Sequence, residues 1–210
     1  MSNVSSGTKD ILTVADIRQR LDRELCVLLT SLAFCEEYLS RPSLTDPPLP
    51  LTLQRKSLLD IFYAFEDAAY LAAARLWDED TDAITLVSAK KLISNDIKDI
   101  WQARYEELNE DSKIVRVNLL NYRDEELGHN LMVCRRRFRA GEDSTYSKKG
   151  ELHDFIVSST KLLFDALNPT MQNAGNDEAA MAKFKLKFSQ ARWSHVALLN
   201  MFDNIKGSMS

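Results

Sequence analysis

The sequence predicts an all-α protein folded as a helical bundle. Apolar residues recur at steps of three and four positions along most of the 210 residues, and no segment alternates apolar and polar residues as a strand does. Glycine and proline, which interrupt helices, number only 6 and 5. The apolar share of 45% and the charged share of 28% are typical of a compact domain with a sizeable core. We therefore expect one all-helical domain over residues 1–210, flexible at residues 1–10 and 206–210.

A proline-rich connection separates the first two predicted helices. Residues 14–39 carry a regular apolar stripe and form the first helix, and residues 42–50 hold four of the five prolines, which cannot continue a helix. The second helix, residues 53–77, is apolar around much of its circumference, which indicates a central position. The acidic run 78–82 lacks the glycine and the terminal glutamate of an EF-hand loop, so we interpret it as a solvated turn.

The second half of the chain predicts several further helices. Thr85 or Ser88 can cap the first of them, and Ser94 or Asn95 can cap the next, because their side chains accept hydrogen bonds from helix N-termini. Residues 109–112 are either a break or a kink. A loop is expected over residues 141–150. The helices themselves are expected over residues 85–93, 94–108, 114–139, 152–167 and 178–205.

Charge and cysteine content exclude some classes of protein. A net charge of −4 argues against non-specific coating of nucleic acid, because such proteins neutralise many phosphates and are basic overall. The 3 cysteines show no CxxC spacing, so neither a disulfide framework nor a zinc site is indicated. No stretch is apolar enough to span a bilayer, and the first residues lack the apolar segment of a signal peptide. We expect a cytoplasmic protein with no membrane partner.

The candidate site for chemistry is the charge-dense segment 122–130. It holds Arg123, whose guanidinium binds phosphate oxygens, and His129, whose imidazole exchanges protons near neutral pH. A six-residue step on a helix rotates by ~600°, so these two side chains lie ~120° apart around the axis. The long arginine side chain, a bend at Gly128 or a symmetric dimer could each bring them together. We favour the dimer.

The same segment resembles a known family signature. Arg123 and His129, with the polar Asp124 and the small Gly128 between them, are similar to the R-x(4–6)-H motif of the HEPN superfamily, whose members are all-helical bundles that dimerise. The likeness to the AbiU-type abortive-infection branch continues in residues 71–78, 83–86 and 150–152. It spans most of residues 14–167, so the resemblance implies a HEPN-like bundle with additional N- and C-terminal helices.

This resemblance implies metal-independent cleavage of RNA in a defence or toxin role. His129 would act as general base on a ribose 2′-hydroxyl, Arg123 would hold the scissile phosphate, and Asp124 would help to orient the site. It further implies a homodimer, no cofactor, an RNA substrate, and an antitoxin or regulatory partner as an option. Gly128 stands where alanine is commoner, and Leu131 replaces a tyrosine that is modified in one branch.

Basic residues beyond the motif could bind substrate. Arg135, Arg136 and Arg139 lie about two helical turns after His129 and, with Asn130, are candidate RNA contacts. Their alternative role is to complement the dipole at a helix C-terminus. The alternative for the whole chain is a catalytically inactive helical module that binds a nucleotide, RNA or a protein partner.

The other histidines offer no second site. Glu126 and His129 match half of a di-metal motif of helical bundles, but no second Glu-x-x-His is present, so no metal site is expected. We expect His153, at a helix start, to be an exposed polar residue. His195, beside Trp193 in an apolar helix, is expected to be packed in the interior.

Overall fold

The computed structural model describes residues 13–41, 53–80, 83–123, 149–168 and 177–207. Every regular element among these residues is helical, which confirms the predicted all-α class. The predicted flexible residues 1–10 lie outside the described ranges. The elements are α1 (Val14–Leu39), α3 (Leu53–Leu76), α4 (Leu86–Ala89), the 3-10 helix η1 (Lys90–Leu92), α5 (Asn95–Asp111), α6 (Lys113–Tyr122), α8 (Lys149–Leu167) and α10 (Asp177–Gly207).

Local sequence signals set the ends of α1. Thr13 is its N-cap: the Asp16 amide donates to the Thr13 hydroxyl over 3.2 Å, and the Thr13 amide donates to the Asp16 carboxylate over 3.0 Å. This reciprocal pair satisfies amide groups that have no partner within the helix. At the other end the Ser40 amide donates to the Glu36 carbonyl over 2.9 Å. Pro42 follows two residues later, where a helix cannot continue.

The choice between a break and a kink near residue 110 is resolved as a break. Helix α5 ends at Asp111, and α6 begins at Lys113. Ser112 serves both helices: its amide donates to the Leu108 carbonyl over 3.2 Å, and its carbonyl accepts from the Arg116 amide over 2.8 Å. The predicted helix over residues 114–139 is described only as far as Arg123, because residues 124–148 lie outside the described part of the chain.

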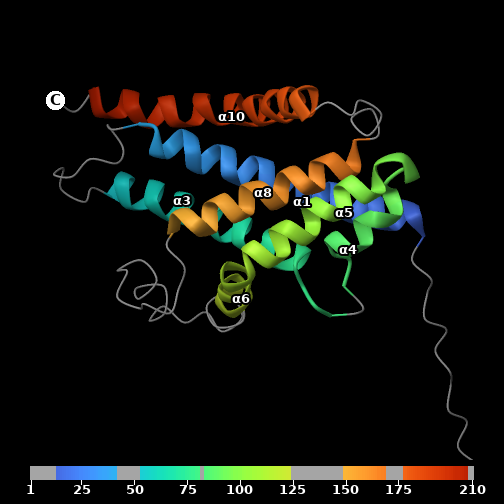
Figure 1. Cartoon of the computed structure of the whole chain (residues 1–210). Helices are drawn as coiled ribbons and strands as arrows, with labels where there is room; N and C mark the ends of the chain where they lie inside the picture. Colours follow the sequence, from blue (N-terminus) through green and yellow to red (C-terminus); the bar gives the residue numbers. More distant parts are fainter. Residues whose placement is uncertain (1–12, 42–52, 81–82, 124–148, 169–176, 208–210) are drawn as a thin grey trace, which may run out of the picture.

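Helix α1 lies between α10 and α3, and α8 packs beside it (Figure 1). The contacts fix the directions of the helices. Arg18, near the start of α1, donates to the Leu167 carbonyl at the end of α8 over 2.8 Å, so α8 runs antiparallel to α1. Arg75 near the end of α3 pairs with Glu24 of α1 over 2.8 Å, which makes α3 antiparallel as well. The long helix α10 runs parallel to α1 (Figure 1).

The buried apolar side chains form two clusters. The larger one joins α1, α3, α4, α5, α6, α8 and the first part of α10, and its fully buried members include Leu21, Leu28, Leu76 and Leu119. The smaller one joins the second half of α1 to α3 and α10 and consists of Phe34, Cys35, Tyr38, Leu58, Phe62 and Leu199. Helix α3 contributes to both clusters, in agreement with its predicted central position. In the described part of the chain, no helix has both the length and the apolar composition that crossing a lipid bilayer requires.

Two tryptophans connect α8 to its neighbours by hydrogen bonds. The indole nitrogen of Trp77, just after α3, donates to the Ser159 hydroxyl over 2.8 Å. That of Trp101 in α5 donates to the Leu162 carbonyl over 3.0 Å. A buried indole N–H needs an acceptor, so these bonds select one packing arrangement of α3 and α5 on α8.

Candidate functional site

The structure places only one of the predicted site residues. Arg123 directly follows α6 and is described. The other candidates lie in residues 124–148, outside the described ranges, so their arrangement stays a prediction; they are Asp124, His129, Asn130, Arg135, Arg136 and Arg139.

The Arg123 side chain is held by a carboxylate of the acidic turn. Its Nη1 donates to Oδ2 of Asp78, which follows α3, and each side chain is 26% exposed. About two turns earlier, on α6, Arg116 pairs with Glu79 over 3.3 Å. The run 78–82, predicted as a solvated turn, therefore contributes two carboxylates that bind α6. Arg123 is therefore a partly exposed cation that is bound to a carboxylate of its own chain.

The preceding residue, Tyr122, is anchored in the core. It is 3% exposed, its hydroxyl donates to the Asp67 carboxylate over 3.0 Å, and its ring meets the Tyr70 ring edge to face at 5.2 Å. Asp67 lies on α3 and Asp78 follows that helix, so these neighbouring residues bind two different carboxylates of the same stretch of chain.

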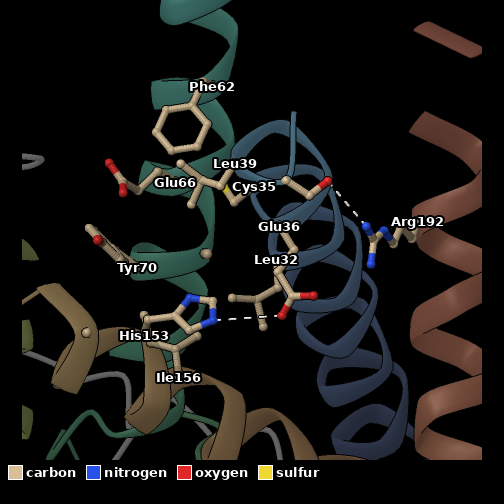
Figure 2. Close-up of a pocket in the computed structure, with 13 residues that line it drawn as sticks. Leu32, Cys35, Glu36, Leu39, Phe62, Glu66, Tyr70, His153, Ile156 and Arg192 are labelled. Atoms are coloured by element: carbon tan, nitrogen blue, oxygen red, sulfur yellow. Dashed lines mark hydrogen bonds and ion pairs between the residues drawn. The ribbon is translucent and has the colours of Figure 1, made fainter. Parts of the chain in front are cut away.

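A hollow that we call the Glu36 pocket is lined by residues of α1, α3, α8 and α10 (Figure 2). Its volume is about 690 Å³. Apolar groups form much of its wall, namely Leu32, Leu39, Phe62, Ala69 and Ile156. Polar groups also line it, namely Glu36, Ser40, Glu66, Tyr70, His153 and Arg192. Tyr70 lines the pocket and also contacts the ring of Tyr122, whereas Arg123 does not line the pocket.

His153 was predicted to be an exposed polar residue, and the structure shows it half-buried in the wall of the pocket. Its side chain is 39% exposed and points across the pocket toward Glu36, with 3.8 Å between Nε2 and Oε1 (Figure 2). The sequence placed it correctly near the start of a helix. It could not show that this end of α8 meets the end of α1, where Glu36 lies.

Burial and the neighbouring Glu66 carboxylate raise the pKa of Tyr70 far above its usual range. The phenol therefore stays protonated and donates its hydrogen bond to Glu66. Glu66 and Asp67 were missed at the sequence level as site residues. The signal was present, because two consecutive carboxylates interrupt the run 61–74 of a central helix, which holds no other charged residue, and buried carboxylates need partners.

His195 is packed in the interior, as predicted. It is 8% exposed, and its ring meets the rings of Phe34 and Phe65 at 5.2 and 5.4 Å. Burial lowers its pKa, although the hydrogen bond that it donates to the Thr30 carbonyl acts in the opposite direction. A neutral imidazole enclosed by aromatic rings has a packing role.

Possible metal ligands are dispersed over the described ranges, where no group of three or more His, Cys, Asp or Glu side chains could hold a metal ion. Of the two cysteines in the described ranges, neither of which forms a disulfide, Cys26 is exposed and Cys35 is buried in the core. Comparison of the chain with family models, curated proteins and solved structures gave no match. The case for a function therefore rests on the sequence motif and on the contacts of its described end.

Proposed function

We propose that this chain is a metal-independent endoribonuclease of the HEPN type with a defence or toxin role. The observation that supports the proposal most directly is the state of Arg123, a partly exposed guanidinium fixed by Asp78 at the end of α6. A cation held in place before substrate arrives loses little freedom on binding a phosphate. The all-α fold is consistent with the class that the R-x5-H motif implies.

In the proposed reaction, His129 removes the proton of a ribose 2′-hydroxyl, and the 2′-oxygen attacks the adjacent phosphorus. The bond from phosphorus to the 5′-oxygen breaks, and that oxygen takes up a proton. The products are a 2′,3′-cyclic phosphate and a 5′-hydroxyl. Arg123 offsets the negative charge that gathers on the phosphate oxygens, and Asp124 supports the site.

The proposal includes a homodimer with Arg123 and His129 of both subunits around one cleft. Arg135, Arg136, Arg139 and Asn130 would contact the RNA strand beyond the scissile bond. Their positive charges would bind phosphates along the substrate, so binding would weaken as salt concentration rises.

The alternative function is a catalytically inactive helical module that binds a nucleotide, RNA or a protein. The same ion pair favours it, because an arginine that is bound to a carboxylate of its own chain can have a structural role alone. Under this alternative, Arg123 and Asp78 join α6 to the end of α3 and take no part in a reaction.

The deciding experiment is RNA cleavage in the presence of EDTA by the parent protein, Arg123→Ala and His129→Ala. Arg20→Ala, a change at an exposed arginine of α1, is the matched control. We expect the parent and the control to produce cyclic phosphate ends, and both motif variants to lose at least about 100-fold in rate. Equal cutting by the motif variants, or intact RNA with the parent, would support the inactive module. Light scattering tests the dimer separately.

A further inference from the structure

Residues 179–202, most of α10, carry only positive charges. Four cationic side chains lie in this range, and no aspartate or glutamate does, although the whole chain has a net charge of −4. The cations are Lys183, Lys185, Lys187 and Arg192. Arg192 is bound to Glu37 of α1, so its charge is compensated, and the three lysines are exposed. A helix with several exposed lysines and no acidic residue attracts a polyanion.

Helix α10 lies at the edge of the bundle, where one of its faces packs on α1 and α8 and the other is directed outward (Figure 1). The packed face carries the buried His195 and Phe184, whose ring meets the Phe164 ring of α8 edge to face at 5.6 Å. The outward face carries Leu186 and Trp193, which are 57% and 71% exposed. Folding therefore leaves most of the surface of these two apolar side chains uncovered.

Leu186 and Trp193 lie on one line along α10. A step of seven residues rotates by ~700° and advances ~10 Å, so the two side chains lie ~20° apart around the axis. By the same geometry, Lys183 and Lys187 lie on one side of this line, and Lys185 lies on the other. An exposed indole and an exposed aliphatic side chain are thus flanked by ammonium groups on both sides.

Cations beside an exposed aromatic ring are the combination that binds single-stranded nucleic acid, because the cations attract phosphates and the ring stacks on bases. Every base has a flat π face, so such a ring accepts any sequence. A lipid surface is a poorer partner, since it requires a continuous apolar face, and the exposed Ser189 and Gln190 lie between Leu186 and Trp193. An acidic protein would use the lysines but would have no need of a flat ring.

From this arrangement we infer that the outward face of α10 binds single-stranded nucleic acid. The lysine ammonium groups bind phosphates along the strand, the Trp193 indole stacks on a base, and Leu186 adds apolar contact. The inference does not depend on the proposed cleavage of RNA, because α10 makes all of these contacts. In an active ribonuclease the same face would hold the substrate at a second place along the strand.

The test uses labelled strands that the proposed reaction cannot cut, so a failure of the ribonuclease proposal leaves it unchanged. A thymidine strand of about a dozen nucleotides lacks the 2′-hydroxyl, and a 2′-O-methyluridine strand of equal length has it blocked. Fluorescence anisotropy of each strand, titrated with the full chain, measures the dissociation constant.

We expect micromolar binding of at least one strand, and the strand that binds more tightly identifies DNA or RNA as the ligand. Labelled polyglutamate, which has negative charges but no bases, should bind more weakly. No binding of either strand at about 100 μM protein would overturn the inference. Equal binding of polyglutamate would also overturn it and would assign the face to an acidic protein.

Variants locate the binding. Trp193→Leu removes the flat ring and should weaken binding at least about fivefold, whereas Trp193→Phe keeps a ring and should retain most of the affinity. The double change Lys185→Gln with Lys187→Gln should weaken binding and reduce the magnitude of the slope of log K against log salt concentration by about 1. Ile100→Ala and Lys98→Gln, at exposed positions of α5, are the matched controls and should bind like the parent.

Two results would contradict this surface. One is parent-like affinity for the strands in Trp193→Leu, with circular dichroism showing that the variant is folded. The other is co-sedimentation of the parent, but not of Trp193→Leu, with vesicles of phosphatidylserine and phosphatidylcholine while neither strand binds, which would assign the outward face of α10 to a membrane.

Discussion

Tyr122 and Arg123 are neighbours in the chain, yet one side chain is fixed in the core and the other is bound near the surface. The hydroxyl of Tyr122 reaches Asp67 within α3, and the guanidinium of Arg123 reaches Asp78 after that helix. Helical periodicity identifies Tyr122 as a side chain close to the apolar stripe. It does not identify the carboxylate that its hydroxyl meets, because a partner on another helix depends on the relative register of the two helices.

Removal of the Tyr122 hydroxyl should destabilise the protein. In Tyr122→Phe, the buried Asp67 carboxylate loses the donor that lies 3.0 Å away, and loss of one partner of a buried polar pair costs about 1–3 kcal/mol. Urea denaturation of parent and variant measures the difference. Tyr105→Phe is the control: its ring stacks on Trp77 and Trp101, and no hydrogen bond of its hydroxyl is described. Equal unfolding free energies for Tyr122→Phe and the parent would show that this hydrogen bond makes no net contribution to stability.

A few polar contacts connect α1 to α10, chief among them those of Glu37 on α1. This carboxylate accepts from Arg41 over 2.8 Å, and it also accepts from Arg192 of α10. Arg41 in turn donates to Asn200 of α10 over 2.9 Å. The pairs connect the end of α1 to the middle of α10, beside the smaller apolar cluster. The lengths of both helices were predicted from local pattern, but this connection was not, since charged residues on a helix surface indicate exposure and not a partner.

The Glu37 cluster should make stability depend on pH at the acidic end. Burial opposes ionisation of Glu37, but the hydrogen bonds and charges of Arg192 and Arg41 outweigh it and lower its pKa. A carboxyl group with a depressed pKa stabilises the fold above its unfolded value, about 4.5, and loses this contribution as pH falls through the folded value. Glu37→Gln should therefore be less stable than the parent at pH 7, by about 1 kcal/mol or more.

Thermal unfolding of parent and Glu37→Gln at pH 7 and at pH 3 measures this effect. The difference in Tm between the two proteins should shrink at the lower pH, because below about 4.5 the unfolded parent takes up a proton that Glu37 in the folded parent resists. Asp99→Asn, at an exposed position of α5, supplies the comparison for general loss of charge. A difference that stayed constant between the two pH values would assign the loss to packing and not to ionisation.

The start of α8 can be stabilised by a small substitution. Gly150 is the second residue of α8, is exposed, and a Cβ placed on it meets nothing within 4 Å. Glycine in a helix costs up to about 1 kcal/mol relative to alanine, because the unfolded chain loses more freedom on folding. Gly150→Ala should raise the Tm in differential scanning calorimetry without changing the far-ultraviolet circular dichroism spectrum. A lower Tm would mean that the backbone at this position needs the freedom of glycine.

At the scale of the whole molecule, α10 completes the bundle by covering α1, and His195 lies at the centre of that contact. Its ring packs between Phe34 of α1 and Phe65 of α3, and the described part of the structure gives its Nε2 no hydrogen-bond partner. A protonated imidazole could not keep this position without a counter-charge. Attachment of α10 therefore depends on a neutral His195.

Stability should fall as pH decreases from neutral, because burial lowers the pKa of His195 below its ordinary value of 6.5. The unfolded chain takes up a proton near pH 6.5, whereas the folded chain resists it, so folding loses free energy between 6.5 and the lower folded pKa. The Tm measured from pH 7.5 to pH 5 should show this slope. The slope should be smaller in His195→Leu than in the parent. An identical slope in His195→Leu would assign it to other groups.

Much of the architecture could be predicted from sequence, and the reason differs for each part. The spacing of apolar residues predicted the extent of α1, α3 and α10 closely, since local periodicity determines a helix and the face that it buries. The Glu36 pocket could not be predicted, because Glu36 and His153 meet only through the packing of α1 against α8. Of the predicted catalytic pair, Arg123 lies within the described ranges and His129 lies outside them.

The tryptophans can serve as intrinsic fluorescence probes of the protein. Trp77 and Trp101 are each 3% exposed, whereas Trp193 on the outer side of α10 is 71% exposed. An aqueous quencher such as iodide reaches the Trp193 indole in the native protein and reaches the other two only after unfolding. Trp193→Phe would therefore leave a protein whose fluorescence follows α3, α5 and α8 alone, and its difference from the parent would report on the surface of α10.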